Sequence, residues 1–261
     1  MDESTDRPEP VIQVAKSAAE PTSATRLSVV IPVYNEAVTI HELVKRVVTA
    51  KLPEGLAKEI VCVNDASKDG TAAKLDELSS LFPEVPIRVL HLPVNRGKGA
   101  ALRAGFAVAT GDIVLIQDAD LEYDPDDYPT LLEPIIEDRA DVVYGSRFIG
   151  SEPHRVHYFW HSVANRMLTL LSNMMTNLNL TDMEVGYKVF RASVLKRIPP
   201  LKCNRFGFEP EVTAKVARLR PRVRVYEVGV SYHGRSYEEG KKITWIDGIK
   251  AVLTILRFRI W

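Results

Sequence analysis

Short apolar runs alternate with longer amphipathic stretches over much of this chain. The apolar runs are rich in Val and Ile and have the length of buried strands; they cover residues 27–33, 59–63, 87–92, 112–116 and 141–144. Between them, apolar residues recur at helical spacing over residues 36–50, 71–80, 98–109 and 126–138. This alternation predicts an α/β fold, with a mostly parallel sheet covered by helices on both faces.

After Gly145 the alternation becomes less regular. The pattern predicts an amphipathic stretch, a short apolar segment, a helix, a strand and a last amphipathic helix, at residues 156–175, 187–190, 209–219, 223–230 and 243–261. Residues 1–26 are rich in Pro, Ser, Thr, Ala and charged side chains without periodicity, which is typical of a disordered tail. We therefore expect this tail, an α/β domain over residues 27–240, and an amphipathic C-terminal helix within residues 241–261.

Composition narrows the classes of partner. Lys and Arg together number 34, as do Asp and Glu, so net charge gives no reason to expect a nucleic-acid partner. Cys62 lies inside an apolar run and is interpreted as a core thiol, which favours a reducing compartment. No stretch has the roughly 18 uninterrupted apolar residues of a membrane span, and the N-terminus lacks the apolar core of a secretory signal.

The predicted strand at residues 113–116 runs into several carboxylates, in Gln117-Asp118-Ala119-Asp120-Leu121-Glu122. In extended backbone, side chains two apart point to the same side, so Asp118, Asp120 and Glu122 are expected to converge. Clustered carboxylates suit a hard divalent cation, Mg²⁺ or Mn²⁺, which would neutralise the charge on a leaving nucleoside diphosphate. The alternative is a solvated acidic loop, because further aspartates follow closely.

Three earlier loops also carry candidate chemistry, because ligands of parallel sheets bind beyond the carboxyl ends of the strands. In the first, Tyr34 is placed to face a base or ribose, although Asn35 or Glu36 also fits a helix start. In the second, Asp65 is placed to accept the N–H of a nucleobase. The third, residues 95–99, opens a helix with glycines that permit close approach of a phosphate. It is neither a dinucleotide fingerprint nor a P-loop.

These loops together resemble family 2 glycosyltransferases with the GT-A fold. The motifs are Pro32-Val33-Tyr34-Asn35-Glu36, Val63-Asn64-Asp65-Ala66-Ser67-Lys68-Asp69-Gly70-Thr71, Asn95-Arg96-Gly97-Lys98-Gly99 and Asp118-Ala119-Asp120. Later stretches resemble the dolichyl-phosphate mannose and glucose synthase branch: Gly145-Ser146-Arg147, Asp182-Met183-Glu184-Val185-Gly186-Tyr187-Lys188, Phe206-Gly207-Phe208-Glu209 and Tyr232-His233-Gly234-Arg235-Ser236. The resemblance covers nearly everything from Leu27 onward.

The resemblance implies an inverting hexosyltransferase that uses Mg²⁺ or Mn²⁺. The donor would be a nucleotide sugar, UDP-glucose or GDP-mannose, and the acceptor a polyprenyl phosphate of the dolichyl or undecaprenyl kind. The resemblance assigns nucleotide-sugar binding to Pro32, Tyr34, Glu36, Asp65, Lys98 and Asp118. It assigns the metal to Asp118, Asp120 and Glu122, and catalysis to Asp118, Asp120, Asp182 and Glu209. Mannose synthases often carry Gln at the position of Glu122, so the identity of the donor stays open.

The chemistry of the acceptor decides which further groups are needed. A polyprenyl phosphate is largely ionised at neutral pH, since a phosphate monoester has a second pKa of about 6, and it needs only cations to hold it. Arg147 and Arg235 suit that role, and His161 is either a phosphate contact or a packed histidine. A hydroxyl acceptor would need a base, for which Asp182 and Glu209 are the candidates. Both carboxylates also fit loop-orienting, capping or ion-pairing roles.

The C-terminal segment indicates where in the cell the protein is located. Trp245, Ile249, Val252 and Leu256 recur at helical spacing with basic residues among them, which fits a helix lying in a membrane interface or one docked on the core. The first interpretation places the enzyme peripherally on the cytoplasmic face of a membrane. The aromatic run at residues 158–160 and the methionines beyond it fit a prenyl groove or core packing.

Two rival functions remain open from the sequence. One is a family 2 enzyme that acts on a glycan or another hydroxyl acceptor. The other, of a different class, is a non-catalytic protein that binds sugar nucleotides, although the intact Asp118-Ala119-Asp120 motif speaks against it. A nucleotidyltransferase is disfavoured because no Gly-rich, lysine-bearing phosphate loop follows the first strand.

Overall fold

The computed structural model describes residues 25–150, 158–234 and 245–258. The predicted N-terminal tail, except for its last two residues, lies outside these ranges, as does Arg235. Both ends of the predicted C-terminal helix also fall outside the described residues.

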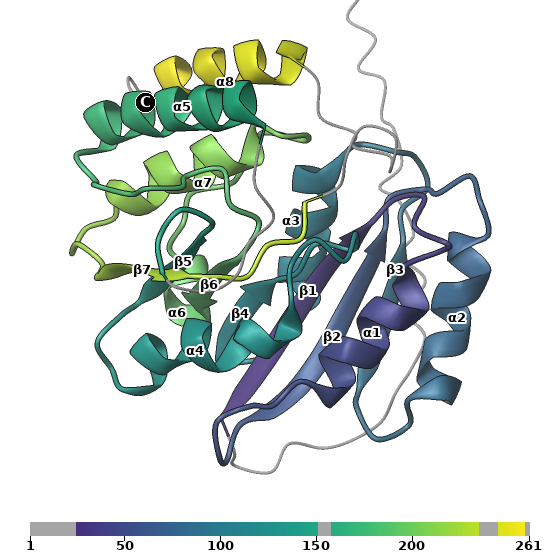
Figure 1. Cartoon of the computed structure of the whole chain (residues 1–261). Coiled ribbons are helices and arrows are strands. Elements are labelled where there is room, and N and C mark those ends of the chain that lie inside the picture. The colour runs from purple at the N-terminus through teal and green to yellow at the C-terminus, as the bar shows by residue number, and fades with distance from the viewer. Residues whose placement is uncertain (1–24, 151–157, 235–244, 259–261) are drawn as a thin grey trace, which may run out of the picture.

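A seven-stranded sheet forms the centre of the molecule, in the order β3-β2-β1-β4-β6-β5-β7 (Figure 1). The strands are β1 (Arg26–Val33), β2 (Ala57–Asn64), β3 (Ile87–His91), β4 (Ile113–Ile116), β5 (Val142–Ser146), β6 (Lys188–Arg191) and β7 (Val225–Gly229). Neighbouring strands are parallel except that β6 is antiparallel to both β4 and β5. The prediction of an α/β fold with a mostly parallel sheet is confirmed.

Helices follow the strands much as the periodicity predicts. They are α1 (Ile40–Thr49), α2 (Thr71–Leu81), α3 (Lys98–Val108), the 3₁₀ turn η1 (Pro125–Asp127), α4 (Tyr128–Ile136), α5 (Phe159–Thr176), α6 (Ala192–Leu195), α7 (Phe208–Ala217) and α8 (Trp245–Arg257). The first helix begins at Ile40 rather than at Glu36, because Asn35 has φ of 53° and the chain makes a turn before the helix. Figure 1 shows α5 and α8 side by side above α7, away from the sheet.

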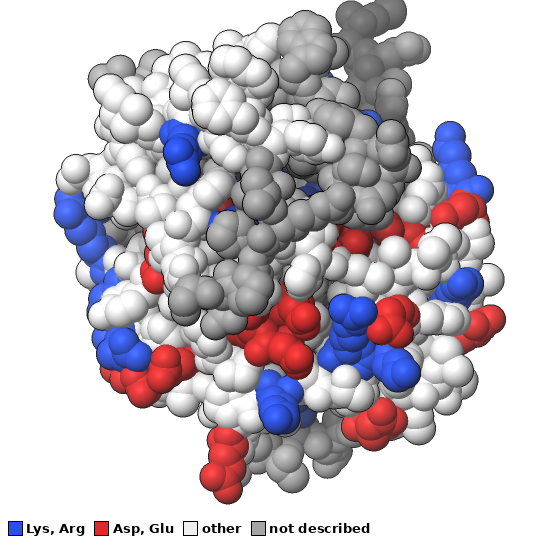
Figure 2. Space-filling view, in the orientation of Figure 1, with Lys and Arg blue, Asp and Glu red and all other residues white. Residues whose placement is uncertain are grey.

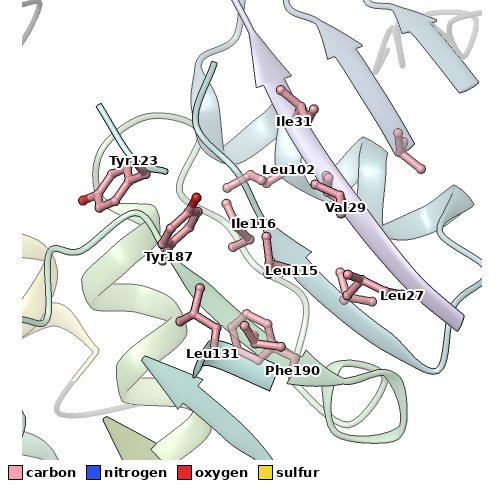
Figure 3. Packing of buried hydrophobic residues seen from close by; sticks show 14 of the residues in the cluster. Leu27, Val29, Ile31, Leu102, Leu115, Ile116, Tyr123, Leu131, Tyr187 and Phe190 are labelled. Atoms are coloured by element: carbon pink, nitrogen blue, oxygen red, sulfur yellow. The ribbon is translucent and has the colours of Figure 1, made fainter. Parts of the chain in front are cut away.

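The core extends through the whole sheet. Consecutive residues of β1, including Val29, Val30 and Ile31, are fully buried, so both faces of this strand are covered. Figure 3 shows the packing running from β1 to Phe190 on β6 and to the ring of Tyr187. The central strands are therefore held rigidly, and their ends can position side chains accurately.

The reversed direction of β6 has a consequence for the site. Because β6 is antiparallel to β4 and β5, the segment that precedes it, residues 182–187, lies at the carboxyl ends of those two strands. Ligands bind beyond that edge in sheets of this kind. Residues far apart in sequence, such as Asp118 and Asp182, are thus brought to one edge.

Candidate functional site

Hydrogen bonds join the loops after β1 and β2. The backbone N–H of Asn35 donates to Ser67 Oγ at 3.0 Å, and the N–H of Lys68 donates to Asn35 Oδ1 at 2.8 Å. At the next residue, the N–H of Glu36 donates to Thr71 Oγ1 at 2.9 Å. The left-handed backbone conformation of Asn35 allows these hydrogen bonds between the two loops, and Asn adopts that conformation more readily than most residues. The two loops are therefore held as one unit.

Asp65 fixes the third loop to this unit. Its carboxylate accepts the backbone N–H of Arg96 at 2.8 Å and that of Gly97 at 2.6 Å, and only 2% of the residue is exposed. Gly97 has φ of 98°, and a side chain there would meet Asn204 and Arg205. The sequence assigned Asp65 to a nucleobase; the structure shows that its carboxylate holds the loop at the start of α3.

The other residues predicted to hold the nucleoside lie at the end of β1 and on the loop that follows it. Pro32 pairs with Val63 of β2 and is half-buried, as is Tyr34, which directly follows the strand. Glu36 is buried, and its Oε2 accepts the hydroxyl of Thr39 at 2.8 Å. The same hydroxyl lies 3.0 Å from the carbonyl oxygen of Ala119. The first loop therefore contacts the loop that carries Asp118 and Asp120.

The three carboxylates after β4 do not converge as extended spacing predicted. The chain turns after Asp118, with φ of 61° at Leu121, so the alternation of side chains is lost. Glu122 Oε2 accepts the hydroxyl of Tyr232 at 2.7 Å, and Asp120 Oδ1 accepts the N–H of Glu122 at 3.2 Å. Within the described ranges, no three acidic, His or Cys side chains form a group that could hold a metal by themselves.

Lys98 joins Asp118 to Glu209. Its Nζ lies 2.6 Å from Asp118 Oδ1 and 3.1 Å from Glu209 Oε1. Burial lowers the pKa of Lys98, but the two carboxylates outweigh that effect and the pKa is raised, so the ammonium stays charged. The pairing links the start of α3, the end of β4 and the first turn of α7. The structure thus brings together three of the predicted site residues.

Arg147 and Asp182 form a buried bidentate ion pair. Arg147 Nε lies 2.7 Å from Asp182 Oδ2, and Nη2 lies 2.8 Å from Oδ1. Asp182 is fully buried, yet the arginine charge and hydrogen bonds outweigh burial and lower the pKa of its carboxyl. A carboxylate that is paired and held ionised is poorly suited to accept a proton, so the pair fits the loop-orienting role of Asp182 rather than a general base.

Further contacts fix this ion pair in place. Asn165 Nδ2 of α5 donates to Asp182 Oδ1 at 3.0 Å, and the N–H of Asp182 donates to Glu227 Oε1 at 3.0 Å. The Arg147 guanidinium lies 5.2 Å from the centre of the Tyr232 ring. Arg147, predicted to contact the acceptor phosphate, already uses Nε and Nη2 on Asp182. His161, also predicted there, lies in the first turn of α5, with its ring 5.7 Å from that of Tyr158.

Sequence reasoning missed the buried polar groups beneath the acidic loop. Gln117 is fully buried, and its Oε1 accepts the hydroxyls of Tyr128 at 2.7 Å and Tyr187 at 2.8 Å. Tyr187 packs against Tyr123, whose hydroxyl accepts the N–H of Gly186 at 2.9 Å (Figure 3). The available signal was a glutamine directly after a buried apolar strand. This network fixes the backbone just before Asp118.

Glu184 and Lys188 were also missed. Lys188 is fully buried, donates to the carbonyl oxygen of Val185 and lies 5.2 Å from the centre of the Tyr144 ring. Burial lowers the pKa of Lys188, whereas burial and the charge of Glu209 raise that of Glu184 to about 8. The signal for Lys188 was the presence of a lysine within the apolar segment 187–190. The charges of Lys98 and Glu209 both act on Lys188, so Lys188 lies near the Lys98–Glu209 pair.

A cavity of about 330 Å³ lies beneath α5. Its lining residues come from α5, from the segment before Asp182 and from the residue after Arg147: Phe148, Arg166, Thr169, Leu170, Asn173, Leu180 and Thr181. Arg166 lies over the Phe148 ring, 5.8 Å from its centre. The cavity thus combines apolar and uncharged polar side chains with one cation, next to the segments that carry the Arg147–Asp182 pair.

Comparison with known proteins identifies related enzymes. The family model "Glycosyl transferase family 2" matches residues 28–199. An undecaprenyl-phosphate mannosyltransferase from Micrococcus luteus is 32% identical over 242 residues, covering 89% of this chain and 93% of that protein. A dodecaprenyl-phosphate galacturonate synthase from Rhizobium johnstonii is 26% identical, covering 88% and 65%, and a dolichol-phosphate mannosyltransferase from Pyrococcus furiosus is 29% identical, covering 84% and 60%. The chain thus spans less than two thirds of the last two relatives.

Solved structures share the fold. Glucosyl-3-phosphoglycerate synthase from Mycobacterium tuberculosis, in complex with Mn²⁺, UDP and phosphoglyceric acid, superposes with a TM-score of 0.66 at 21% identity, covering 90% of this chain and 78% of that one. The same enzyme with Mg²⁺ and UDP gives a TM-score of 0.63 at 21% identity, covering 90% and 79%. At this identity the likeness shows the fold.

Proposed function

This chain belongs to glycosyl transferase family 2, as its loop motifs indicated, and we propose that it transfers a hexose from a nucleotide sugar to a polyprenyl phosphate. The observation that carries the proposal is the charged site at the strand ends, where Lys98 joins Asp118 to Glu209 beside the Arg147–Asp182 pair. The names of the relatives support the acceptor, since those proteins are sugar transferases or synthases of undecaprenyl, dodecaprenyl and dolichol phosphates.

The first three loops would bind the nucleotide part of the donor. Pro32 near the end of β1 and Tyr34 directly after it are half-buried, and Asp65 holds the third loop against the second. Asp65 would reach the base only if its carboxylate accepted a further hydrogen bond. The start of α3 lies next to this unit, where helix N–H groups favour a diphosphate.

Asp118 and Asp120 are the residues that would hold Mg²⁺ or Mn²⁺ together with the diphosphate. Two carboxylates fit this ion, because Mg²⁺ in nucleotide enzymes takes one or two protein carboxylates and completes its shell with phosphate oxygens and water. The ion would neutralise charge on the leaving nucleoside diphosphate. Lys98 already lies 2.6 Å from Asp118, and its positive charge offsets part of the negative charge of that carboxylate. Glu122, held by Tyr232, is better placed to fix the loop than to bind the ion.

The state of the carboxylates supports a phosphate acceptor. Asp182 is bound to Arg147, and one carboxylate oxygen of Glu209, Oε1, lies 3.1 Å from Lys98, so each candidate base has a cation beside it. A phosphate acceptor arrives ionised and can displace the diphosphate directly, with inversion, without losing a proton to the protein. Arg147 and Arg235 remain the cations proposed to hold that phosphate, with His161 as a further contact.

An exposed apolar surface on α5 and α8 suits the lipid part of the acceptor. Its members are large and at least 41% exposed: Tyr158, Phe159, Trp160, Met167, Leu170, Met174, Ile249, Leu253 and Leu256. On α8 they alternate with Ala251 and Ile255, which are buried, as is Phe258 directly after the helix, so the helix docks by one face and presents another. Figure 2 shows few charged side chains in this upper region.

We assign this surface to the bilayer interface on the cytoplasmic side, where it would deliver the prenyl chain toward Arg147. None of the described helices has the length and apolar character needed to cross a bilayer. Replacing Ile249 and Leu253 by Glu should reduce co-sedimentation with anionic vesicles without lowering the melting temperature. Unchanged vesicle binding would remove the surface from the proposal.

The direct test is a transfer assay with the purified protein. UDP-glucose and GDP-mannose are each offered with a short polyprenyl phosphate and Mn²⁺ or Mg²⁺, and the lipid-linked sugar is measured. We expect transfer with one donor, loss of that transfer in Asp120→Ala, and retention in Asp126→Ala, whose side chain is exposed on the same loop. Donor hydrolysis without transfer to the lipid would favour a hydroxyl acceptor. Nucleotide binding without turnover of any donor would favour a non-catalytic binding protein.

A further inference from the structure

Two buried carboxylate oxygens have no hydrogen-bond partner within the described part of the chain. They are Glu184 Oε1 and Glu209 Oε2, and Glu209 is only 4% exposed. Leaving a buried polar atom unpaired is unfavourable, and native structures do so rarely. Acceptors of this kind point to a hydrogen-bond donor that is supplied from outside the chain.

Both oxygens lie at the edge where the donor is proposed to bind. The other oxygen of the Glu209 carboxylate lies 3.1 Å from Lys98 Nζ, which in turn lies 2.6 Å from Asp118. Glu184 stands two residues before Gly186, where a side chain would collide with Asp118 and Tyr123. Glu209 is thus linked through Lys98 to Asp118, the carboxylate assigned to the diphosphate end of the donor, and Glu184 belongs to the segment that packs against Asp118 at Gly186.

The charges around these oxygens restrict what can bind to them. The nearby cations are engaged, since Lys98 lies between Asp118 and Glu209 and Lys188 donates to the carbonyl oxygen of Val185. Burial and the charge of Glu209 disfavour the ionised form of Glu184, raising its pKa. Surroundings that disfavour a second negative charge on the protein disfavour one on the ligand for the same reason. The complementary ligand is therefore neutral and rich in hydroxyl donors.

We propose that Glu184 and Glu209 accept hydrogen bonds from hydroxyl groups of the donor's sugar ring, so that the site selects a neutral hexose over a hexuronic acid. This inference rests on the proposed function, since it assumes a nucleotide-sugar donor. Glu184 is the specificity-determining residue in this arrangement, because Glu209 also pairs with Lys98. A hexuronate would bring a carboxylate close to that of Glu209, and neighbouring carboxylates disfavour each other's charged form.

The test compares binding of the nucleotide diphosphate with binding of the nucleotide hexose, without acceptor, for wild type, Glu184→Leu and Glu184→Gln. Titrations use UDP against UDP-glucose and GDP against GDP-mannose. Glu184→Leu should lose about tenfold in affinity for the nucleotide hexose and keep its affinity for the diphosphate, because only the hydroxyl contact is removed. Glu184→Gln keeps an acceptor oxygen and should retain most of the affinity. Glu54→Leu, at an exposed position, should change neither.

Stability provides a readout that a merely structural role would not produce. Since Glu184 carries an unpaired buried oxygen, Glu184→Leu should melt at the same temperature as the wild type or higher without ligand. The corresponding uronate donors, UDP-glucuronate and GDP-mannuronate, should bind the wild type at least about tenfold more weakly than the hexose donors.

Each contrary outcome has a distinct meaning. Equal losses for diphosphate and hexose in Glu184→Leu, or a lower melting temperature with unchanged binding, would overturn the role of Glu184. If Glu184→Leu does not fold, Glu184→Ala takes its place, and equal losses for diphosphate and hexose in that variant overturn the role as well. A uronate donor that binds as tightly as the hexose donor would overturn the selection. Absence of binding by every nucleotide tested would instead sink the proposed function.

Discussion

The loops beyond the carboxyl ends of the strands form two groups, one from each half of the chain, and different interactions hold each group together. In the N-terminal half, the loops after β1, β2 and β3 are joined through backbone N–H groups, as where Asn35 accepts from Lys68 and Asp65 accepts from Gly97. In the C-terminal half, buried ion pairs join distant segments, as where Arg147 binds Asp182. The arrangement of the N-terminal loops therefore depends on hydrogen bonds to backbone N–H groups. The arrangement of the C-terminal segments depends on pairing of buried charges.

The difference predicts unequal sensitivity to substitution. Removing one partner of a buried ion pair leaves a charge without compensation, whereas removing one hydrogen bond to a backbone N–H has a smaller effect. Figure 2 shows acidic side chains gathered near the middle of one face, with basic ones beside them. Exposed ion pairs also occur, such as Arg139 with Glu137 and Arg46 with Glu42. Surface pairs contribute little, which provides internal controls.

The largest effect is expected for Arg147→Met. The substitution leaves the fully buried Asp182 without its guanidinium, so the free energy of unfolding should fall by about 3–5 kcal/mol. Chemical denaturation at neutral pH measures this. Arg139→Met, which removes an exposed pair with Glu137, should cost less than about 1 kcal/mol. Similar small losses in both variants would contradict the contrast between the two halves.

A smaller effect is expected for Asp65→Asn. The amide retains one acceptor oxygen, so one of the N–H groups of Arg96 and Gly97 loses its partner, at a cost of about 1–3 kcal/mol. Asp126→Asn, at an exposed position, serves as the control in the same denaturation experiment. A cost for Asp65→Asn as large as that for Arg147→Met would show that backbone hydrogen bonds and buried ion pairs do not differ here.

The smallest effect is a pH dependence that belongs to the C-terminal half. Burial and Glu209 raise the pKa of Glu184 from 4.5 to about 8. Between these values the folded protein holds a proton that the unfolded chain has lost, so the contribution of this group to stability falls as pH rises through the window. Glu209, Lys188, Arg147 and Asp182 are the charged groups that act on it.

Glu184→Gln should therefore flatten the profile of unfolding free energy against pH between about 5 and 8 relative to wild type. Burial lowers the pKa of Lys188, which makes its own contribution rise with pH only above that window, up to the unfolded value of 10.5. Denaturation midpoints measured across this range give the comparison. Parallel profiles in the two proteins would show that the pKa of Glu184 is not raised, and would contradict a buried-charge contribution to stability in the C-terminal half.

Much of the fold could be predicted from the sequence. The predicted strand at residues 27–33 and the predicted helix at 98–109 agree with β1 and α3 to within one residue, because local periodicity reflects burial on a regular element. The first helix was predicted one turn too early, since the left-handed backbone at Asn35 is not visible as periodicity. The direction of β6 was not predicted either, because an apolar run has no orientation.

The candidate site was predicted in its members and not in its arrangement. The spacing of Asp118, Asp120 and Glu122 predicted convergence, but the chain turns between them and Tyr232 binds Glu122. Asp182 fits both a base and an ion-pair partner from sequence alone, and its pairing with Arg147 is visible only in the structure. Glu184 and Lys188 gave a weak signal because charged residues next to apolar ones usually lie at the surface.

The sequence by itself determined the alternating α/β architecture, the family and the loops in which chemistry occurs, because each depends on residues that are close along the chain. The tertiary structure decided which carboxylates are paired, which loops are joined and which oxygens are left to a ligand. Those outcomes depend on distances between residues as far apart as Lys98 and Glu209, and on burial, which sets both the strength of a charge pair and the cost of leaving it incomplete.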